Sequence, residues 1–390
     1  MAATAKRKID PMVLIAVMIL AGLGIVMVYS ASFVVAGQRM GDSYHFLKKQ
    51  GLAAALGLSL MFFMAKIDYH RWRSLSLPLL LLSLALLSIL IVPGWRQVAG
   101  GSARWLKFSS FSFQPAELAK LALVIYLAHS LAKKEDRIKS FRAGFLPYLI
   151  VLGIFFVLVL KQPDFGTGIV FAALVFIMIF AAGTRLLFLG STLFGALPFL
   201  LFLALLADYR KERLLAFLNP WDHPEDAGFQ IIQSFLAFGA GKIFGVGLGD
   251  GKQKLFYLPE VHTDFILPVI GEELGLLGVS VVIFVFVLLV IRGFQISLKA
   301  PDLFGIYLAL GIAALLAIQT LLNMGVVMGL LPTKGSTLPF ISYGGTSLMI
   351  NLMAAGILLN ISSRTARSAD ENHDRRGGDG RASLPRVGRG

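Results

Sequence analysis

The sequence contains no cysteine, and charged residues make up only 15% of its 390 positions. The absence of cysteine excludes disulfide bonds, thiolate catalysis and cysteine-based metal sites. A soluble domain carries about 25% charged residues, so this low share argues against a water-soluble protein. Hydrophobic residues instead make up 57%, and a further 40 residues are glycine. The composition predicts a membrane protein.

The apolar residues are concentrated in runs of about 20, the length with which a helix crosses a hydrocarbon core about 30 Å thick. We predict an all-α polytopic membrane protein with ten transmembrane helices and a large extracytoplasmic loop, residues 207–263, between spans seven and eight. Pro268 is expected to kink the eighth span or mark its boundary. The expected spans are residues 12–36, 50–66, 75–93, 115–132, 144–160, 167–183, 186–206, 265–291, 303–329 and 343–361.

The basic residues indicate the orientation. With the N-terminus inside, 21 of the 36 Lys and Arg residues lie on the inner side and 14 on the outer side, six of them in the long loop that the positive-inside rule does not count. We therefore expect a cytoplasmic N-terminus (1–11), a membrane domain (12–362) and a disordered basic cytoplasmic tail (363–390). The net charge of +14 suits this rule and anionic headgroups, whereas no nucleic-acid module is visible.

Two ionisable residues, Glu117 and Lys120, lie three positions apart within the fourth expected span and therefore share one helix face. Each ionisable group costs at least about 2.5 kcal/mol to insert into a membrane, so both need an explanation. One explanation is an intrahelical ion pair that buries both charges. The other is a cavity in which Lys120 helps to neutralise an anionic headgroup.

The densest polar cluster beside the membrane is residues 257–275, with Glu260, His262, Asp264, Glu272 and Glu273. Asp264 lies at the water–membrane edge, where partial desolvation raises the pKa of a carboxylate toward the range of a general base. A helix N-cap explains it equally well. We expect one of the two adjacent glutamates to pair with a basic residue elsewhere in the bundle. Glu260 and His262 are too few for a recognisable zinc site.

Two glycine-rich segments flank the last spans. Residues 239–253 do not form a phosphate-binding P-loop, because Gln253 follows Lys252 where Ser or Thr is required. We expect a closely packed outer loop there, whose Gly245, Gly247 and Gly249 allow backbone N–H groups to approach a pyrophosphate.

The second glycine-rich segment, residues 323–348, also contains two prolines. Irregular backbone at membrane depth requires cover by protein or a water-filled cavity. We therefore expect a re-entrant or tightly packed outer connection in which Lys334 points into a polar space.

Five motifs of the chain resemble those of the SEDS proteins (shape, elongation, division and sporulation), a family that includes FtsW and RodA. They occur in the family's order over residues 12–362. The Thr333-Lys334-Gly335 step is more similar to the division-specific FtsW branch than to RodA. Leu267 and Pro268 depart from the family's pattern but leave Asp264 intact. The matching blocks are GSARWLKFSSFSFQPAELAKL (101–121), KQPDFGTG (161–168), NPWDHPEDAGFQIIQS (219–234), LPEVHTDFILPVIGEELG (258–275) and GLLPTKGSTLPFISYGGTS (329–347).

The resemblance implies a ten-span fold and a peptidoglycan glycosyltransferase. Such an enzyme polymerises lipid II into β-1,4-linked glycan strands on the outer face of the cytoplasmic (inner) membrane, with release of undecaprenyl pyrophosphate, during septal wall synthesis. It also implies partners: a class B penicillin-binding protein (an FtsI-like transpeptidase) and other divisome membrane proteins at the division septum.

The family's catalytic aspartate maps onto Asp264. Inversion at the anomeric carbon requires one carboxylate base and charge stabilisation at the leaving group. As pyrophosphate-binding residues we expect Arg104, Lys120, Lys334 and Lys242, with Glu117 beside Lys120 and a divalent cation, Mg²⁺ or Mn²⁺, as a further candidate. Two other functions remain open, a lipid II flippase and a non-catalytic division scaffold.

Overall fold

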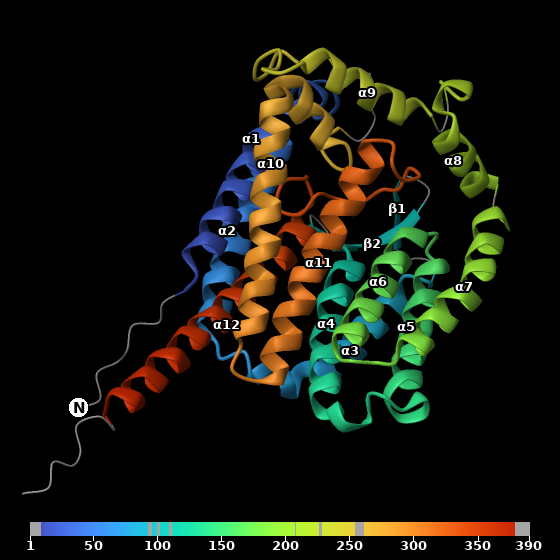
Figure 1. Cartoon of the computed structure of the whole chain (residues 1–390). Helices are drawn as coiled ribbons and strands as arrows, with labels where there is room; N and C mark the ends of the chain where they lie inside the picture. Colours follow the sequence, from blue (N-terminus) through green and yellow to red (C-terminus); the bar gives the residue numbers. More distant parts are fainter. Residues whose placement is uncertain are drawn as a thin grey trace, which may run out of the picture.

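The computed structural model describes residues 9–92, 96–99, 102–108, 111–206, 208–225, 228–253 and 261–378, and nearly all of them are helical (Figure 1). Three short strands, β1 (Arg96–Ala99), β2 (Ser102–Phe108) and β3 (Phe111–Phe113), form an antiparallel sheet in the order β1-β2-β3. The helices are α1 (Pro11–Met40), α2 (His45–Lys66), α3 (Arg71–Ile89), α4 (Pro115–Lys133), α5 (Leu146–Leu160), α6 (Phe165–Ala181), α7 (Leu186–Leu206), α8 (Asp208–Leu218), α9 (Phe229–Gly241), α10 (Ile266–Lys299), α11 (Leu303–Val327) and α12 (Gly345–Gly378).

Each of the ten expected spans coincides with one helix, α1 to α7 and α10 to α12. Eight of these are long and apolar enough to cross a membrane, whereas α6 has only 17 residues. Helix α7, with 21 residues, is apolar along its length but is not among the eight. The polytopic, almost wholly helical membrane fold is thus confirmed. The small sheet and the two helices α8 and α9 inside the long loop were not predicted from the sequence.

The ends of two spans differ from the expected ones. Helix α10 starts at Ile266, so Pro268 lies in its first turn, where a missing N–H leaves no hydrogen bond unmade. The break in α10 is instead at Gly275, whose φ of 68° lies in the left-handed region. Helix α12 continues to Gly378, beyond the expected end of its span, and the predicted disorder of residues 379–390 concerns positions outside the described part of the chain.

Aspartate N-caps start three of the helices. Asp10 accepts hydrogen bonds from the backbone N–H groups of Met12 and Val13 at the start of α1, where Pro11 occupies the first turn. Asp164 and Asp302 cap α6 and α11 in the same way. A side-chain acceptor at this position satisfies backbone donors that the helix leaves unpaired.

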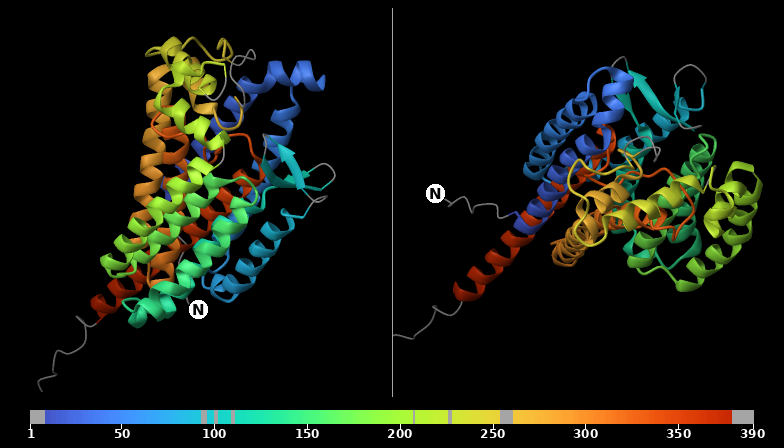
Figure 2. Two further views of the ribbon diagram at one scale, coloured as in Figure 1. Left: turned by 90° about the vertical axis from the view of Figure 1, so that its right-hand side faces the viewer. Right: turned by 90° about the horizontal axis from the view of Figure 1, so that it is seen from above.

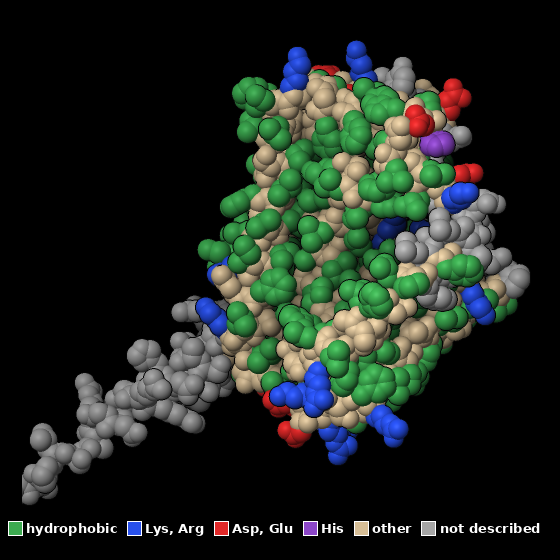
Figure 3. Space-filling view, turned by 45° about the vertical axis from the view of Figure 1, so that its right-hand side comes forward, with side chains coloured by type: hydrophobic (Ala, Val, Ile, Leu, Met, Phe, Trp, Pro, Cys, Tyr) green, Lys and Arg blue, Asp and Glu red, His purple; other side chains and the backbone are tan. Residues whose placement is uncertain are grey.

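The connections alternate between two ends of the bundle (Figures 1 and 2). The terminal face carries Ile9 and the connections 67–70, 134–145, 182–185 and 300–302. The loop face, at the opposite end, carries the sheet, α8, α9 and the connection 328–344. On the side of the molecule that Figure 3 shows, apolar side chains cover most of the surface between the two faces, while most Lys, Arg, Asp and Glu side chains lie toward the two ends.

Helices α4 and α11 form the centre of the bundle. The two helices pack against each other. Helix α4 also packs against α3, and α11 also packs against α10, while α12 packs against α2. The most apolar stretches of α4 and α11 are 78% and 72% buried, against 28% for α2 and 22% for α3. Polar residues on these two central helices are therefore shielded from lipid and are available to line an interior cavity.

Candidate active site

A cavity of about 930 Å³ opens at the loop face. Five of the six predicted site residues line it: Asp264, Arg104, Lys120, Lys334 and Glu117. They come from β2, α4 and the connections 261–265 and 328–344. In the space-filling view, Lys or Arg side chains are visible inside a hollow of the otherwise apolar surface (Figure 3).

The carboxylate of Asp264 lies against the backbone of Gly335. A Cβ atom on Gly335 would be 2.7 Å from Asp264 Oδ2, so any larger residue would force this carboxylate to move, whereas Arg104 Nη1, at 3.5 Å, would be in ordinary contact. Helix α10 has Phe265 at its N-cap and no side-chain cap hydrogen bond. The N-cap explanation for Asp264 is therefore wrong, and its carboxylate lines the cavity instead.

Asn323 of α11 holds together the two connections that carry the site. Its Nδ2 atom donates to the backbone oxygen of Asp264 at 2.9 Å and to that of Ser336 at 2.6 Å. Asn323 is 1% exposed, and its Oδ1 atom has no hydrogen-bond partner among the described residues. This central helix thus fixes the position of Asp264 relative to the Thr333–Thr337 segment.

Asp164 is a cavity residue that the sequence analysis did not single out. Its Oδ1 accepts from the Thr167 backbone N–H at 3.1 Å, its Oδ2 from the Thr167 hydroxyl at 2.7 Å, and Arg104 Nε lies 3.4 Å from Oδ2. The N-cap of α6 therefore also orients the guanidinium of Arg104, whose Nη2 donates to the Pro163 carbonyl at 3.2 Å. An aspartate immediately before the apolar run of the sixth span was the available signal.

Lys334 crosses the start of α6 and donates from Nζ to the backbone oxygen of Gly166 at 2.7 Å. A Cβ atom on Gly166 would lie 1.8 Å from Lys334 Cε, so a side chain there would displace the lysine. Burial is the main cause that lowers the pKa of Lys334 from 10.5 to about 8. Two neighbouring cations lower it further, and two neighbouring carboxylates oppose the shift. The expected tight packing of residues 328–344 around a polar space is thus present.

Glu117 and Lys120 form the intrahelical ion pair that one explanation predicted, and they do so at a cavity. Lys120 Nζ donates to Glu117 Oε1 at 2.8 Å, and both side chains are almost fully buried. Both also line the cavity. The ion pair therefore forms part of the cavity wall at the depth of α4.

Lys242 lies apart from this group. It follows the end of α9 with a φ of 47°, its side chain is exposed, and its backbone oxygen accepts from Leu276 N at 2.8 Å. The backbone N–H groups of Val246 and Gly247 donate to the carbonyls of Glu272 and Glu273. The loop is thus fastened along α10, and these N–H groups are not available to a pyrophosphate.

The two adjacent glutamates both accept hydrogen bonds from other segments of the chain. Glu272 accepts from the backbone N–H groups of Lys252 and Gln253 at 2.8 and 3.2 Å. Glu273 accepts from the hydroxyl of Ser30 on α1. Glu260 lies outside the described residues.

Two further features of the cavity wall were missed. Arg213 of α8 reaches it, and its Nη1 lies 3.5 Å from the backbone oxygen of Thr333. His262, Phe46 and Tyr343 form a cluster of rings beside Asp264, with centroids 4.4 to 5.4 Å apart. The sequence shows the residue types but cannot show that separate loops bring them together.

The described residues contain no group of three or more His, Asp or Glu side chains placed to hold a metal ion. Three of the described lining residues carry carboxylates, Asp264, Asp164 and Glu117. Those of Asp164 and Glu117 are already bonded to Thr167 and Lys120. The protein side chains alone therefore do not form a complete cation site in this part of the chain.

Comparison with known proteins identifies the family. A family model described as "Cell cycle protein", covering the FtsW, RodA and SpoVE proteins, matches residues 11–367. The chain belongs to this family. A relative from Geobacter sulfurreducens, named probable peptidoglycan glycosyltransferase FtsW, is 52% identical over 358 residues, which are 92% of this chain and 96% of the relative.

Solved structures support the same assignment. The crystal structure of the rod shape determining protein RodA from Thermus thermophilus matches with a TM-score of 0.67 and 28% identity, over 91% of this chain and 96% of that chain. A chain from a structure entitled "Structural coordination of polymerization and crosslinking by a peptidoglycan synthase complex" matches with a TM-score of 0.74 and 28% identity, over 92% and 98% of the two chains. The family resemblance inferred from the sequence motifs is confirmed.

Proposed function

We propose that this chain is a peptidoglycan glycosyltransferase that polymerises lipid II at the loop face and releases undecaprenyl pyrophosphate, in septal cell-wall synthesis. The observation that carries the proposal is the placement of one carboxylate, Asp264, in a cavity with the cations Arg104, Lys120 and Lys334. The relatives named FtsW support the same activity.

The reaction requires one proton acceptor and one site for negative charge. The 4-hydroxyl of an acceptor N-acetylglucosamine attacks the anomeric carbon of N-acetylmuramic acid, and the bond from that carbon to the pyrophosphate oxygen breaks. The hydroxyl proton passes to the Asp264 carboxylate, which acts as general base. Attack from the face opposite the leaving group converts an α-linked donor into a β-1,4 linkage.

The cations stabilise the charge that develops on the departing pyrophosphate. Lys334 is suited to this role because, among the residues that the structure describes, its ammonium bonds a neutral carbonyl and forms no ion pair with a carboxylate. Arg104 is held by Asp164 and lies beside the Asp264 carboxylate, which places it between base and leaving group. Lys120 contributes from the deeper wall while paired with Glu117.

A divalent cation, Mg²⁺ or Mn²⁺, fits the site only with substrate oxygens as ligands. Mg²⁺ commonly binds through one or two carboxylates together with substrate phosphates, and here the protein offers one carboxylate of that kind, Asp264. Bound in this way, the cation would add positive charge at the pyrophosphate.

We place the loop face outside the cytoplasm and both termini in the cytoplasm of the septal membrane. The excess of basic residues toward the terminal face supports this orientation. The proposed partner is an FtsI-like class B transpeptidase, supported by the structural match to a chain of a peptidoglycan synthase complex.

The deciding experiment measures glycan strands formed from purified lipid II by the reconstituted chain with its cognate transpeptidase. We expect strands from the wild type and a loss of at least about 10²-fold with Asp264→Ala, because a positioned general base contributes about 10²–10⁴-fold. The matched control is Asp42→Ala, which removes an exposed carboxylate of the loop face that pairs with Lys48 and does not line the cavity.

Other results identify the competing functions. Movement of lipid II between liposome leaflets without strand formation would assign a flippase instead. Full activity of folded Asp264→Ala would refute the base assignment. Normal division of cells that carry Asp264→Asn, together with no strand formation by the wild type, would indicate a scaffold.

A further inference from the structure

A second cavity, of about 710 Å³, opens at the terminal face and shares no residue with the catalytic cavity. It lies between the first turns of α3 and the last turns of α4, and the segment after α4 closes it. None of the steps proposed for glycan synthesis uses it. Its lining residues are Arg73, Ser74, Ser76, Leu77, Tyr126, His129, Ser130, Lys133, Lys134, Asp136 and Arg137.

The wall of this cavity is basic. Arg73, Lys133, Lys134 and Arg137 face a single carboxylate, Asp136. A concave wall with an excess of one sign of charge raises the local concentration of ions of the opposite sign. The arrangement therefore selects for an anionic ligand.

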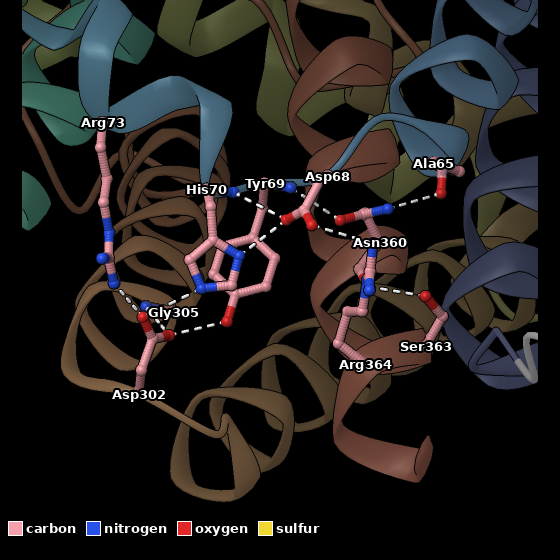
Figure 4. A network of polar contacts seen from close by, with 10 residues as sticks. All are labelled: Ala65, Asp68, Tyr69, His70, Arg73, Asp302, Gly305, Asn360, Ser363 and Arg364. Carbon is pink, nitrogen blue, oxygen red and sulfur yellow. Dashed lines mark hydrogen bonds and ion pairs between the residues drawn. The ribbon is translucent and has the colours of Figure 1, made fainter. Parts of the chain in front are cut away.

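Among the described residues, one of these four cations, Arg73, is paired with a carboxylate. Asp302 pairs with Arg73, and Asp68 pairs with Arg364 (Figure 4). Among the residues that the structure describes, Lys133, Lys134 and Arg137 form no ion pair with a carboxylate. Their charge remains available.

Two of the cations are held in place by aromatic rings. The guanidinium of Arg73 lies 5.0 Å from the ring centroid of Phe304, and Nζ of Lys134 lies 5.5 Å from that of Tyr148. Asp302 also bonds Arg73 (Figure 4). Fixed cations lose less conformational freedom when a ligand binds than solvated ones do.

The rim of the cavity is apolar on the side of α3. Leu77 belongs to the lining and is 54% exposed, and Leu75 and Leu81 of the same helix are also exposed. In a membrane-spanning helix, such leucines face acyl chains. The cavity thus combines an anion-binding interior with a hydrocarbon-facing rim.

We propose that this cavity binds the phosphate headgroup of an anionic phospholipid from the leaflet at the terminal face. Basic pockets between membrane helices bind such headgroups. The acyl chains extend along the exposed leucines of α3, and the phosphate lies among Lys133, Lys134 and Arg137. A soluble phosphate would contact the basic interior of the cavity but not its apolar rim.

The test uses the full-length chain in nanodiscs of equal parts phosphatidylglycerol and phosphatidylcholine, followed by native mass spectrometry of the lipids that remain bound. The wild type should retain phosphatidylglycerol in preference to phosphatidylcholine. The variant Lys133→Gln/Lys134→Gln/Arg137→Gln should lose this preference by at least about tenfold, because each basic residue near the surface contributes to the attraction.

The matched control, Lys139→Gln/Arg142→Gln/Lys299→Gln, removes three exposed cations near the terminal face that do not line the cavity. It should retain the wild-type preference, as should the charge-preserving Lys133→Arg/Lys134→Arg. An equal loss in both glutamine variants, or no loss in the first, would overturn the proposal. Displacement of the lipid by millimolar inorganic phosphate would overturn the lipid source and assign a soluble phosphate ligand. A loss in the arginine variant would show an effect of packing and overturn it too.

Discussion

The polar networks at the two ends of the bundle use the same residue types in opposite ways. At the terminal face, Asp302 accepts from Tyr69 Oη at 2.7 Å and from Gly305 N at 3.0 Å, and it pairs with Arg73 and His70 (Figure 4). Its negative charge is thus compensated within the protein. At the loop face, Lys334 donates to a neutral carbonyl oxygen at 2.7 Å, and within the described part of the chain it forms no ion pair with a carboxylate.

The terminal-face network serves to join helices. Asn360 of α12 accepts from Tyr69 N at 2.9 Å and donates to Ala65 O at 2.8 Å, while Arg364 of α12 pairs with Asp68 (Figure 4). Asp302 adds the start of α11 to the same connection. Charges that compensate one another within the protein are suited to structure, whereas a buried cation bonded to a neutral group is suited to an anionic ligand.

Removing the ammonium of Lys334 is the strongest way to test this difference. We expect Lys334→Met to lower the rate of glycan polymerisation about 10²–10³-fold, because a preorganised group that stabilises developing charge has an effect of this size. The measurement is strand formation from lipid II. Lys48→Met, which removes an exposed lysine of the loop face, should keep wild-type activity. Comparable losses in both variants would show that general surface charge matters and not the cavity.

The close approach of Asp264 to Gly335 offers a test that leaves every charge in place. Gly335→Ala puts a methyl group 2.7 Å from Asp264 Oδ2 and should lower activity about 100-fold, since small displacements of a catalytic group have effects of this size. Gly344→Ala in the same connection is the control, because its nearest side-chain atoms lie 3.6 Å away. If Gly335→Ala kept wild-type activity, the Asp264 carboxylate would function even when it is displaced.

The pH profile distinguishes Lys334 from the compensated cations. A lysine with a pKa of about 8 is charged below that pH and neutral above it, so kcat/KM should fall as the pH rises through about 8, by up to about tenfold per unit. The pH at which kcat falls should be higher, because the pyrophosphate of the bound substrate stabilises the charged form of Lys334 and so raises its pKa. Lys334→Arg stays charged and should lack this alkaline limb, although its overall activity is lower. An unchanged limb in that variant would assign the titration to another group.

The sequence predicted the helices far better than the loops. Apolar runs of about 20 residues have few alternatives to spanning a membrane, which is why all ten segments coincide with helices. The short strands β1 to β3 were missed, although the alternation within Ser102–Phe108 is a strand signal. In these loops, packing between distant segments decides the structure.

In the site, too, residues whose position depends on contacts between distant segments could not be predicted from the sequence. Charges such as Lys120 were identified because ionisable residues within spans are rare, and Asp264 because it lies in a recognisable motif. Asp164 was missed because its part in the cavity depends on contact with Arg104, 60 positions earlier in the chain. Lys242 was placed with the cations because sequence does not show that its loop is fastened to α10.

The smallest effect on activity is expected at the terminal face, from Asp302→Asn. Asparagine keeps the N-cap of α11 but loses the ion pairs with Arg73 and His70, and partly exposed pairs of this kind contribute up to about 1 kcal/mol. We therefore expect a lower midpoint of thermal unfolding in detergent, with polymerisation within about twofold of the wild type because the catalytic cavity lies at the other end of the bundle. If this variant instead lost as much activity as Lys334→Met while remaining folded, the two networks would be coupled, and the division of the molecule into a structural end and a chemical end would be wrong.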